Sequence, residues 1–531
     1  MNDTAPSEPP ADAPGEIVRF LQSPQAHGTP AQPVELIETH ISWVFLTDRH
    51  AYKLKKPVKF GFLDFSTSEA RRRACEDEVR LNERLAPGVY QGVVPVVRRR
   101  SGGLALASEG EPTGEDAGKV VDWVVAMQRL DHDQAVDVRI RTGRLTQEQV
   151  RQISDRLTDF YRRLPPLELS GEDYRHRIEQ HVRDNLEVLS DPDHGLDAAS
   201  VRRVHQRQLR FVRLGRTVLD ERAAAGKILE GHGDLRPEHI FLTPEPVVID
   251  CLEFSLDLRT IDVADELAFL AMECERLGAD WVGRQIRTAY EYDCDDASPD
   301  ELFDFYKSYR ACVRAKVNVL RLAQTHDDER QHATTLVNEY LHLADCASER
   351  FGHPLVAVVT GLSGTGKSTL AEEIAGAWQA ALRQTDQIRK SLFGSGDLSA
   401  APDKGVYHPE LRAKVYEQMM HEAEELLREG HWVVLDGTFL TPGALASARQ
   451  LAGRHGALWL LVRCECPAEI AMQRISQRKA AGGSVSDADI ETCRQQHRQA
   501  DELMRGYATL VVDTTRPLVD QMEKVERYLV E

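Results

Sequence analysis

One stretch of the chain, residues 361–369, constrains the fold more than any other. It reads Gly-Leu-Ser-Gly-Thr-Gly-Lys-Ser-Thr and fits the pattern G-x-x-x-x-G-K-[ST]. An apolar, β-branched run (Leu355–Val359) precedes it, and a stretch of helical character (Leu370–Trp378) follows it. In a glycine-rich loop between a buried strand and a helix N-terminus, backbone N–H groups and the helix dipole face a phosphate. The sequence therefore predicts a loop that binds a nucleoside triphosphate.

We expect the residues of this loop to have different roles in binding the nucleotide. Glycines let the backbone wrap closely around a phosphate, so that successive N–H groups point inward. We expect Lys367 to reach the β- and γ-phosphates of ATP and Ser368 to hold Mg²⁺. The residues expected to contact the nucleotide are Gly361, Leu362, Ser363, Gly364, Thr365, Gly366, Lys367, Ser368 and Thr369. The alternative is a glycine-rich turn without a ligand, which the flanking strand and helix disfavour.

Two acids follow at the ends of later strands in this half of the chain. Asp386 comes after a predicted strand at 380–385, and ligands of open α/β sheets gather at the carboxyl ends of strands. We expect Asp386 to orient or deprotonate an acceptor hydroxyl; the alternative is that it caps the helix predicted at 388–392. Asp436 ends the strand predicted at 431–435, where an acid can hold the coordination shell of Mg²⁺.

Two arginines further on predict a lid. Arg474 and Arg478 stand one helical turn apart, ahead of the flexible segment Lys479–Ser484. Such a pair suits a lid that closes over a transferring phosphate and excludes water. The alternative is a solvated charged face. Beyond a final strand at 510–513, we expect Thr514 and Arg516 to lie near the adenine.

A second group of charged residues lies near the N-terminus. Lys53 and Lys55 are two positions apart in a predicted strand, so both project from one face. Glu78 falls on the apolar stripe of a predicted helix at 69–85, and a buried acid is costly unless it is paired. A strand lysine paired with a helix glutamate is how protein kinases place the phosphates of ATP. Which lysine does so stays open, and a solvated edge face is the alternative for both.

The segment 231–240 resembles a catalytic loop. It reads Gly-His-Gly-Asp-Leu-Arg-Pro-Glu-His-Ile, and a short apolar strand at 247–249 then ends at Asp250. We expect Asp234 to accept the proton of an attacking hydroxyl and Asp250 to ligate the metal that bridges the phosphates. The alternative is that two acids decorate an ordinary loop.

These residues support a resemblance to a known family. Residues from about 30 to 345 resemble the aminoglycoside phosphotransferase-like kinases, particularly in Thr39–Thr47, Tyr52–Pro57 and Phe60–Phe65. The resemblance implies a two-lobed kinase fold with ATP in the cleft, and the roles given above for Lys53 or Lys55, Glu78, Asp234 and Asp250. The family usually has Asn five positions after the catalytic Asp, where this chain has His239. An imidazole there can still ligate a cation, but it suits Mg²⁺ less well than a carbonyl oxygen does.

The C-terminal part resembles a second family. Residues from about 354 to 531 resemble the P-loop kinases grouped with gluconate kinase, chloramphenicol phosphotransferase and zeta-type toxins. The likeness is carried by Thr385–Lys390, Val434–Leu440 and Ser486–Asp489. The order of the two parts looks like a known bacterial fusion of these two kinase types. The resemblance does not supply the substrate.

The sequence predicts a multidomain protein of the α/β and α+β classes. We expect a disordered tail at 1–15 and a protein-kinase-like domain at 16–350, with an N-lobe at about 30–125 and a C-lobe at about 126–350. A P-loop domain at 354–531, a parallel sheet with helices on both faces, completes the chain. Length alone favours several units, because 531 residues exceed what one core usually supports.

Charge and composition narrow the function. The formal net charge of −19 disfavours a nucleic acid as the partner, because affinity for a phosphate backbone comes from clustered Lys and Arg. No apolar run is long enough to span a bilayer and the acidic N-terminus is unlike a secretory signal, so we expect a cytoplasmic protein. The prediction is an ATP- and Mg²⁺-dependent phosphotransferase with two nucleotide sites, acting on a hydroxyl of a small molecule. Alternatives are a P-loop kinase regulated by a non-catalytic kinase-like domain, a toxin-like kinase, and a nucleic-acid 5′-hydroxyl kinase. The acceptors and the oligomeric state stay open.

Overall fold

The computed structural model describes most of the chain, which divides by contacts into two compact units. The described residues are 13–28, 33–60, 63–100, 102–107, 118–322, 327–352, 354–393, 409–440, 442–480, 507 and 509–530. The first unit comprises Met1–Tyr174, Glu221–Asn318 and Thr325–Leu343, and the second comprises Arg175–Asp220, Val319–Gln324 and Ala344–Glu531. The boundary predicted near residue 350 is drawn from motifs and stays a prediction. Each unit is described by itself.

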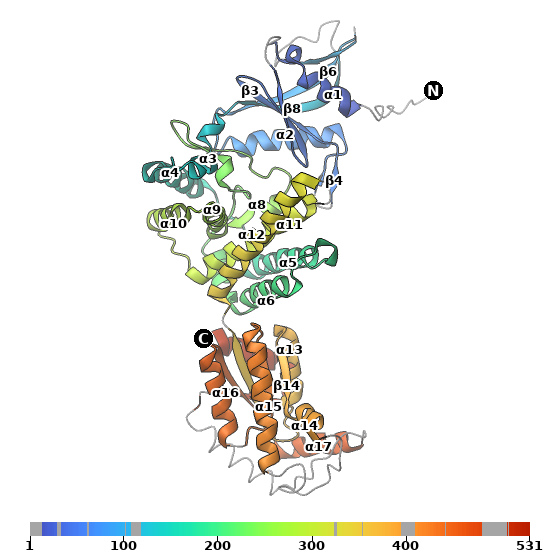
Figure 1. Ribbon diagram of the computed structural model, residues 1–531, viewed down its shortest axis with the longest axis vertical. Helices are drawn as coiled ribbons and strands as arrows, with labels where there is room; N and C mark the ends of the chain where they lie inside the picture. Colours follow the sequence, from blue (N-terminus) through green and yellow to red (C-terminus); the bar gives the residue numbers. More distant parts are fainter. Residues whose placement is uncertain are drawn as a thin grey trace, which may run out of the picture. The chain divides into compact units, whose positions relative to one another are not determined.

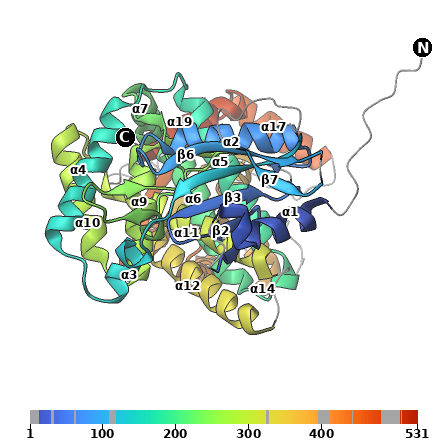
Figure 2. The same cartoon turned by 90° about the horizontal axis from the view of Figure 1, so that it is seen from above.

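A six-stranded antiparallel sheet opens the first unit (Figure 1). Its order is β1-β2-β3-β8-β6-β7, with bounds β1 Glu35–Glu38, β2 Ser42–Leu46, β3 His50–Lys55, β6 Tyr90–Arg98, β7 Leu104–Leu106 and β8 Lys119–Gln128. Helix α2 (Ser68–Asn82) packs against β6 and β8, and Figure 2 shows it lying along the sheet. Leu54 packs into a cluster with Phe45 on the opposite face. The period of two therefore leaves Lys53 and Lys55 on the α2 side.

Helices and three two-stranded antiparallel sheets make up the rest of the described first unit. The pair of β9 (Ile228–Glu230) with β12 (Thr260–Asp262) and the hairpin of β10 (Ile240–Phe241) with β11 (Val247–Val248) frame the segment predicted as a catalytic loop. Behind them lies α9 (Val263–Arg276), whose residues from Val263 to Cys274 are all buried. The other elements are α1 Ala13–Gln22, β4 Lys59–Phe60, β5 Leu63–Asp64, α3 Val136–Arg141, α4 Gln147–Arg163, α8 Leu256–Arg259, α10 Asp280–Cys294, α11 Asp300–Leu322 and α12 Asp327–Phe351.

One outcome concerns the tail predicted at 1–15. Helix α1 begins at Ala13, so the end of the predicted tail is helical; Pro14 fits a first helical turn because its missing N–H would be unpaired there anyway. Residues 1–12 lie outside the described part. Further along the chain, helices α6 (Ala198–Leu214) and α7 (Arg216–Ala224) meet at Gly215.

A five-stranded parallel sheet forms the core of the second unit (Figure 1). Its order is β14-β15-β13-β16-β17, with bounds β13 Leu355–Thr360, β14 Ala381–Gln384, β15 Val433–Asp436, β16 Leu458–Glu465 and β17 Leu510–Asp513. Every residue of the central strand β13 is buried, because helices cover both faces. Alternate residues serve the two sides: Val356 and Val358 pack with α15 and α16, while Ala357 and Val359 pack with α13 and α19.

The helices that cover the sheet are chiefly α13 Lys367–Trp378, α15 Pro409–Arg428, α16 Pro442–Arg454 and α19 Leu518–Val530. The second unit also includes α5 Gly171–Leu189, α6, α14 Thr385–Phe393 and α17 Ala468–Ala480. A parallel sheet covered on both faces is the fold expected for this half, and the predicted fold class is confirmed. Among the described residues, no helix is both long and apolar enough to cross a bilayer.

Candidate active sites

A chain of ion pairs joins the sheet of the first unit to α2 and to the loop after β11. Lys53 Nζ lies 2.8 Å from Glu78 Oε1 and 2.7 Å from Asp250 Oδ1. Lys55 Nζ lies 2.5 Å from Glu78 Oε2 and also pairs with Glu253. The predicted lysine–glutamate pair is therefore present, and Glu78 holds both lysines. Burial raises the pKa of Glu78, but the charges of the two lysines outweigh it and lower the pKa overall.

The two lysines have different partners. Lys53 alone of the pair contacts Asp250, the acid predicted to ligate metal. Lys55 is completely buried, and its ammonium group lies 5.6 Å from the centre of the Phe65 ring. Lys53 is thus placed to meet a phosphate that binds at Asp250, whereas Lys55 ties Glu253, three residues beyond Asp250, to the same sheet. The sequence left this choice open.

The segment 231–239 is fixed from behind by a helix residue that sequence reasoning missed. Glu266 of α9 accepts hydrogen bonds from the backbone N–H of His232 at 2.8 Å and of Gly233 at 2.5 Å, and from the hydroxyl of Tyr161 at 2.8 Å. Gly233 has a φ of 84°, and a Cβ there would lie 3.0 Å from a methyl group of Leu252. The available signal was an acid in the middle of the apolar run that forms α9.

Asp234 is paired in this state. Arg236 Nε donates to Asp234 Oδ2 at 3.1 Å, and another nitrogen of the same guanidinium pairs with Glu238. Burial raises the pKa of Asp234, but Arg236 and the cations around it lower the pKa overall. The carboxyl group is therefore ionised at neutral pH and able to accept a proton. Sequence reasoning did not foresee the Arg236 contact.

His239 and Asp250 face one another across a short gap. His239 Nε2 lies 3.6 Å from Asp250 Oδ2, and its Nδ1 lies 2.9 Å from the carbonyl oxygen of Asp234. Asp250 has a φ of 65°, a left-handed conformation that is uncommon for a residue other than glycine. Burial raises the pKa of Asp250, but Lys53 and other cations lower it well below its ordinary range. The two predicted metal ligands are therefore brought together.

The glycine-rich loop of the second unit curls at the start of α13. Gly364 and Gly366 have φ values of 82° and 83°, and Gly366 is the residue at which the helix begins. A Cβ on Gly364 would lie 2.5 Å from the carbonyl oxygen of Ala471, so no larger residue fits. The Thr365 hydroxyl donates to the Leu362 carbonyl at 2.8 Å and closes the turn. Lys367 and Ser368 then open the helix, where orphan N–H groups favour an anion.

Asp436 lies at the end of β15, as the sequence predicts, and it is 4% exposed. Gln384 donates to its Oδ2 at 3.1 Å, whereas Oδ1 is buried with no hydrogen-bond partner in the described part of the chain. Burial raises the pKa of Asp436, and the charge of Lys367 and the hydroxyl of Ser368 partly offset the rise. A buried carboxylate oxygen without a partner, close to a serine hydroxyl, fits an oxygen-coordinated cation such as Mg²⁺.

Asp386 lies in the first turn of α14, directly after β14. Its side chain is 74% exposed, and Arg389 lies 2.9 Å from its Oδ1. The charge of Asp386 is close enough to contribute to the raised pKa of Asp436. Asp386 is therefore at the sheet edge where the acceptor is expected, with a carboxylate open to solvent.

Arg474 contacts the end of β17. Its guanidinium donates to the Thr514 hydroxyl at 3.2 Å and to the Thr514 carbonyl at 2.9 Å, and the Thr514 hydroxyl donates to the Thr365 carbonyl at 2.6 Å. The arginine thus links α17 to the glycine-rich loop through Thr514. Arg478 belongs to α17, but its side chain and the segment 481–500, with Ser486–Asp489, lie outside the described residues.

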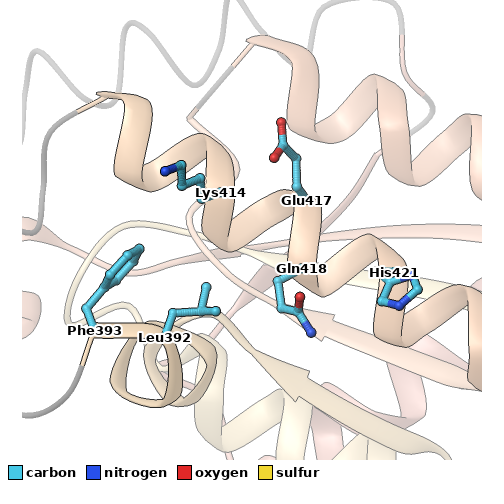
Figure 3. A pocket seen from close by; sticks show the side chains of 6 residues that line it. All are labelled: Leu392, Phe393, Lys414, Glu417, Gln418 and His421. Atoms are coloured by element: carbon cyan, nitrogen blue, oxygen red, sulfur yellow. The ribbon is translucent and has the colours of Figure 1, made fainter.

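A hollow of about 430 Å³ lies between α14 and α15 (Figure 3). It is lined by Leu392, Phe393, Lys414, Glu417, Gln418 and His421. The hollow adjoins the C-terminal end of the helix whose first turn carries Asp386. In the described part of the chain, no group of three or more His, Cys, Asp or Glu side chains is arranged to hold a metal by itself. A metal at either site would therefore need phosphate or water ligands as well.

Comparisons with known proteins divide the chain in the same order. A model described as phosphotransferase enzyme family matches residues 48–302, and a model described as AAA domain matches residues 356–503. An uncharacterized protein of Mycobacterium tuberculosis is 33% identical over 487 residues, which cover 90% of this chain and 92% of that protein. An uncharacterized protein of Mycobacterium bovis matches to the same extent.

Solved structures match one part of the chain or the other. A putative kinase from Chloroflexus aurantiacus is 21% identical with a TM-score of 0.28, over 33% of this chain and 97% of that one. A choline kinase from Cryptosporidium parvum is 12% identical with a TM-score of 0.38, over 64% of this chain and 96% of that one.

Proposed function

This chain belongs to the family of the two mycobacterial proteins and joins a phosphotransferase-family domain to a P-loop kinase domain; on that premise we propose that it has two separate sites, each transferring the γ-phosphate of ATP to a hydroxyl group of a small molecule. The observation that carries the proposal is the position of Lys53, which joins Glu78 to Asp250 beside the loop of Asp234. The domain division is proposed to lie at 350–354.

In the first site, Lys53 binds the phosphates and Glu78 holds it in place. Asp234 accepts the proton of the attacking hydroxyl. Arg236, which donates to Asp234, either turns away before this step or keeps the carboxylate oriented during it. A divalent cation held by Asp250 and His239 would neutralise charge on the transferring phosphoryl group. Because Asp234 and Asp250 would repel the phosphates of ATP, the cations paired with them, Arg236 and Lys53, also lower that repulsion.

In the second site, the N–H groups of residues 361–369 enclose the phosphates and Lys367 reaches the transferring group. Ser368 and Asp436 would hold Mg²⁺, which would screen the phosphate charges. Asp386 orients or deprotonates the acceptor hydroxyl. Arg474, with Arg478 on the same helix, stabilises the closed arrangement around the nucleotide. The hollow between α14 and α15 is the proposed beginning of the acceptor-binding surface.

A second candidate concerns the first site alone. Asp234 is paired with Arg236, and His239 stands where the resembling kinases have Asn, so this domain would serve as a ligand-binding regulator of the P-loop kinase. The net charge of −19 disfavours the nucleic-acid 5′-hydroxyl kinase, and a flat salt dependence of binding would dispose of it. A toxin-like kinase would differ from the main proposal in its acceptor, which would be a nucleotide sugar.

One experiment tests both proposals. The full chain, Lys367→Ala and Asp234→Asn are each incubated with γ-labelled ATP and a pool of small metabolites, and labelled products are separated. Two catalytic sites predict two sets of products, each lost in one variant. If Asp234→Asn loses no product while Lys367→Ala loses all, the first site is a regulator. If neither change affects labelling, the proposed function is wrong.

A further inference from the structure

The hydrogen bonds of His239 fix which ring nitrogen can bind a metal. His239 lies on the short helix η4 (Pro237–His239) and is 7% exposed. Its Nδ1 faces the carbonyl oxygen of Asp234 at 2.9 Å, and because a carbonyl oxygen only accepts, Nδ1 must carry the hydrogen. Nε2 accepts from a guanidinium nitrogen of Arg236 at 2.9 Å. The single lone pair of Nε2 is therefore held by Arg236, and it can bind a cation beside Asp250 only when Arg236 releases it.

The other nearby imidazole is already satisfied. His232 Nε2 lies 2.9 Å from the carbonyl oxygen of Ile249, so this nitrogen is a donor, and its Nδ1 accepts from the backbone N–H of Asp234 at 3.3 Å. Neither nitrogen of His232 is left for a cation. The ligand set that the first site offers is thus one carboxylate, from Asp250, and one imidazole nitrogen, from His239.

This ligand set differs in kind from that of the second site. Ser368 and Asp436 offer oxygen atoms only, the ligands that Mg²⁺ prefers. Imidazole nitrogen binds Mg²⁺ poorly but binds first-row transition ions well, and those ions also accept carboxylate and phosphate oxygen. We propose that the first site takes a divalent first-row transition ion in preference to Mg²⁺, whereas the second site takes Mg²⁺. Mn²⁺, the weakest binder of that series, is the probe used below because it is visible by electron paramagnetic resonance. The inference rests on the proposed binding of ATP at the first site.

A metal ion at Asp250 and His239 would displace the two side-chain cations that contact them. Arg236 donates to His239 Nε2, and Lys53 donates to Asp250 Oδ1. Each keeps another carboxylate if it yields, because Arg236 also pairs with Asp234 and Lys53 also pairs with Glu78. A divalent ion would therefore replace positive charge that is already beside Asp250 and His239. Lys53 and Arg236 would each keep a carboxylate partner.

The test measures metal preference apart from turnover. The full chain carrying Lys367→Ala and Ser368→Ala, which disable the second site, is given the β,γ-methylene analogue of ATP. Bound Mn²⁺ is followed by electron paramagnetic resonance, and Mg²⁺ is added as a competitor. We expect the preference for Mn²⁺ over Mg²⁺ to fall by about tenfold or more when His239→Asn is added, the size of effect that changes around a metal produce. His194→Asn, a change of the same kind at a half-buried residue of the second unit, should leave the preference unaltered.

A second readout reports the bond itself. Electron spin echo modulation should show coupling of Mn²⁺ to a histidine nitrogen in the chain that keeps His239. The coupling should be absent when His239→Asn is added. An equal Mn²⁺-to-Mg²⁺ preference with and without His239, or no nitrogen coupling, would overturn the proposal. Failure of the proposed function looks different: Mn²⁺ would bind with its nitrogen coupling, but no labelled product would form from ATP.

Discussion

Lys53 and Asp250, 197 positions apart in the sequence, are joined by a hydrogen bond of 2.7 Å from Nζ to Oδ1. The two side chains neutralise one another at the centre of the first site. Glu78 Oε1 lies 2.8 Å from Lys53 Nζ on the other side. On the proposed function, ATP would replace the contact of Lys53 with Asp250 by a contact with phosphate, and the contact with Glu78 would persist.

The first prediction separates the two lysines by activity. Lys53→Met should reduce turnover at the first site by about 10²–10³-fold, the loss typical when one donor to a transition-state anion is removed. The fold should survive because Lys55 still pairs with Glu78. The measurement is phosphate transfer from labelled ATP in a Lys367→Ala background, with circular dichroism to check folding.

Lys55→Met is the matched control, and its effect should be mainly on stability. Lys55 is completely buried between Glu78 and Glu253, so its loss leaves buried carboxylate charge unpaired. Removing one partner of a buried ion pair costs roughly 3–5 kcal/mol. Urea unfolding should show that loss for Lys55→Met and a smaller one for Lys53→Met. A loss of turnover in Lys55→Met without a loss of stability would mean that Lys55, and not Lys53, binds the phosphate.

Local sequence motifs predict those parts of each site whose residues lie close together in the sequence. The loop 361–369 was predicted because glycines, a lysine and a serine follow a buried strand at fixed spacing. The pairing of Glu78 with a strand lysine was predicted because a buried acid needs a partner. Both are present in the structure, whereas the roles of these residues in binding ATP stay predictions.

Contacts between distant segments could not be predicted. The choice between Lys53 and Lys55 depends on where Asp250 and Glu253 arrive, almost 200 residues later, and no local pattern encodes that position. Arg474 was expected to face phosphate from a helix face, but its partner Thr514 directly follows the last strand of the sheet. Glu266 was missed because its partners are two backbone N–H groups, which leave no trace in residue types, and the hydroxyl of Tyr161, 105 positions earlier.

The second prediction concerns Asp234 as a base. Asp234→Asn should lower turnover at the first site by about 10²–10⁴-fold, the usual contribution of general base catalysis, and leave ATP binding intact. Because Arg236 and the neighbouring cations hold the pKa of Asp234 below its ordinary value, the carboxylate is ionised at neutral pH. Its own titration should therefore add no acid limb to the rate profile near neutral pH. Undiminished turnover in Asp234→Asn would show that the base is elsewhere.

The third prediction isolates the second site. In an Asp234→Asn background, Lys367→Ala should remove most ATP-dependent transfer, by about 10²–10³-fold or more, because the lysine meets charge on the transferring group. The protein should still fold, since Lys367 is the half-buried first residue of α13 and not part of the apolar core. Calorimetry with ATP and Mg²⁺ and a thermal melt give the two readouts. Persistent transfer in this double variant would refute the assignment of Lys367.

The fourth prediction asks what Arg474 does. Its guanidinium donates to Thr514, which in turn contacts Thr365, so Arg474→Ala should loosen the nucleotide site as a whole. Loss of a charged hydrogen bond of about 1.5–3 kcal/mol predicts a KM for ATP raised by roughly tenfold or more, with kcat less affected. Arg474→Lys should restore little, because a lysine cannot donate to both Thr514 oxygens in a fixed fork. A large fall in kcat at constant KM would instead place Arg474 on the transferring phosphate.

The last prediction is a pH dependence of stability that originates at His232. Burial lowers the pKa of His232 to about 4, and its neutral ring satisfies both nitrogens by donating to Ile249 and accepting from Asp234. The unfolded chain has a histidine pKa of about 6.5, so between these values it binds a proton that the folded chain does not. Stability should therefore fall as the pH is lowered through this window, by about 2 kcal/mol between roughly pH 7 and roughly pH 5. In His232→Gln, whose amide cannot be protonated there, that part of the pH dependence should vanish from urea unfolding curves. Identical pH dependence in the two proteins would mean that folding does not lower the pKa of His232.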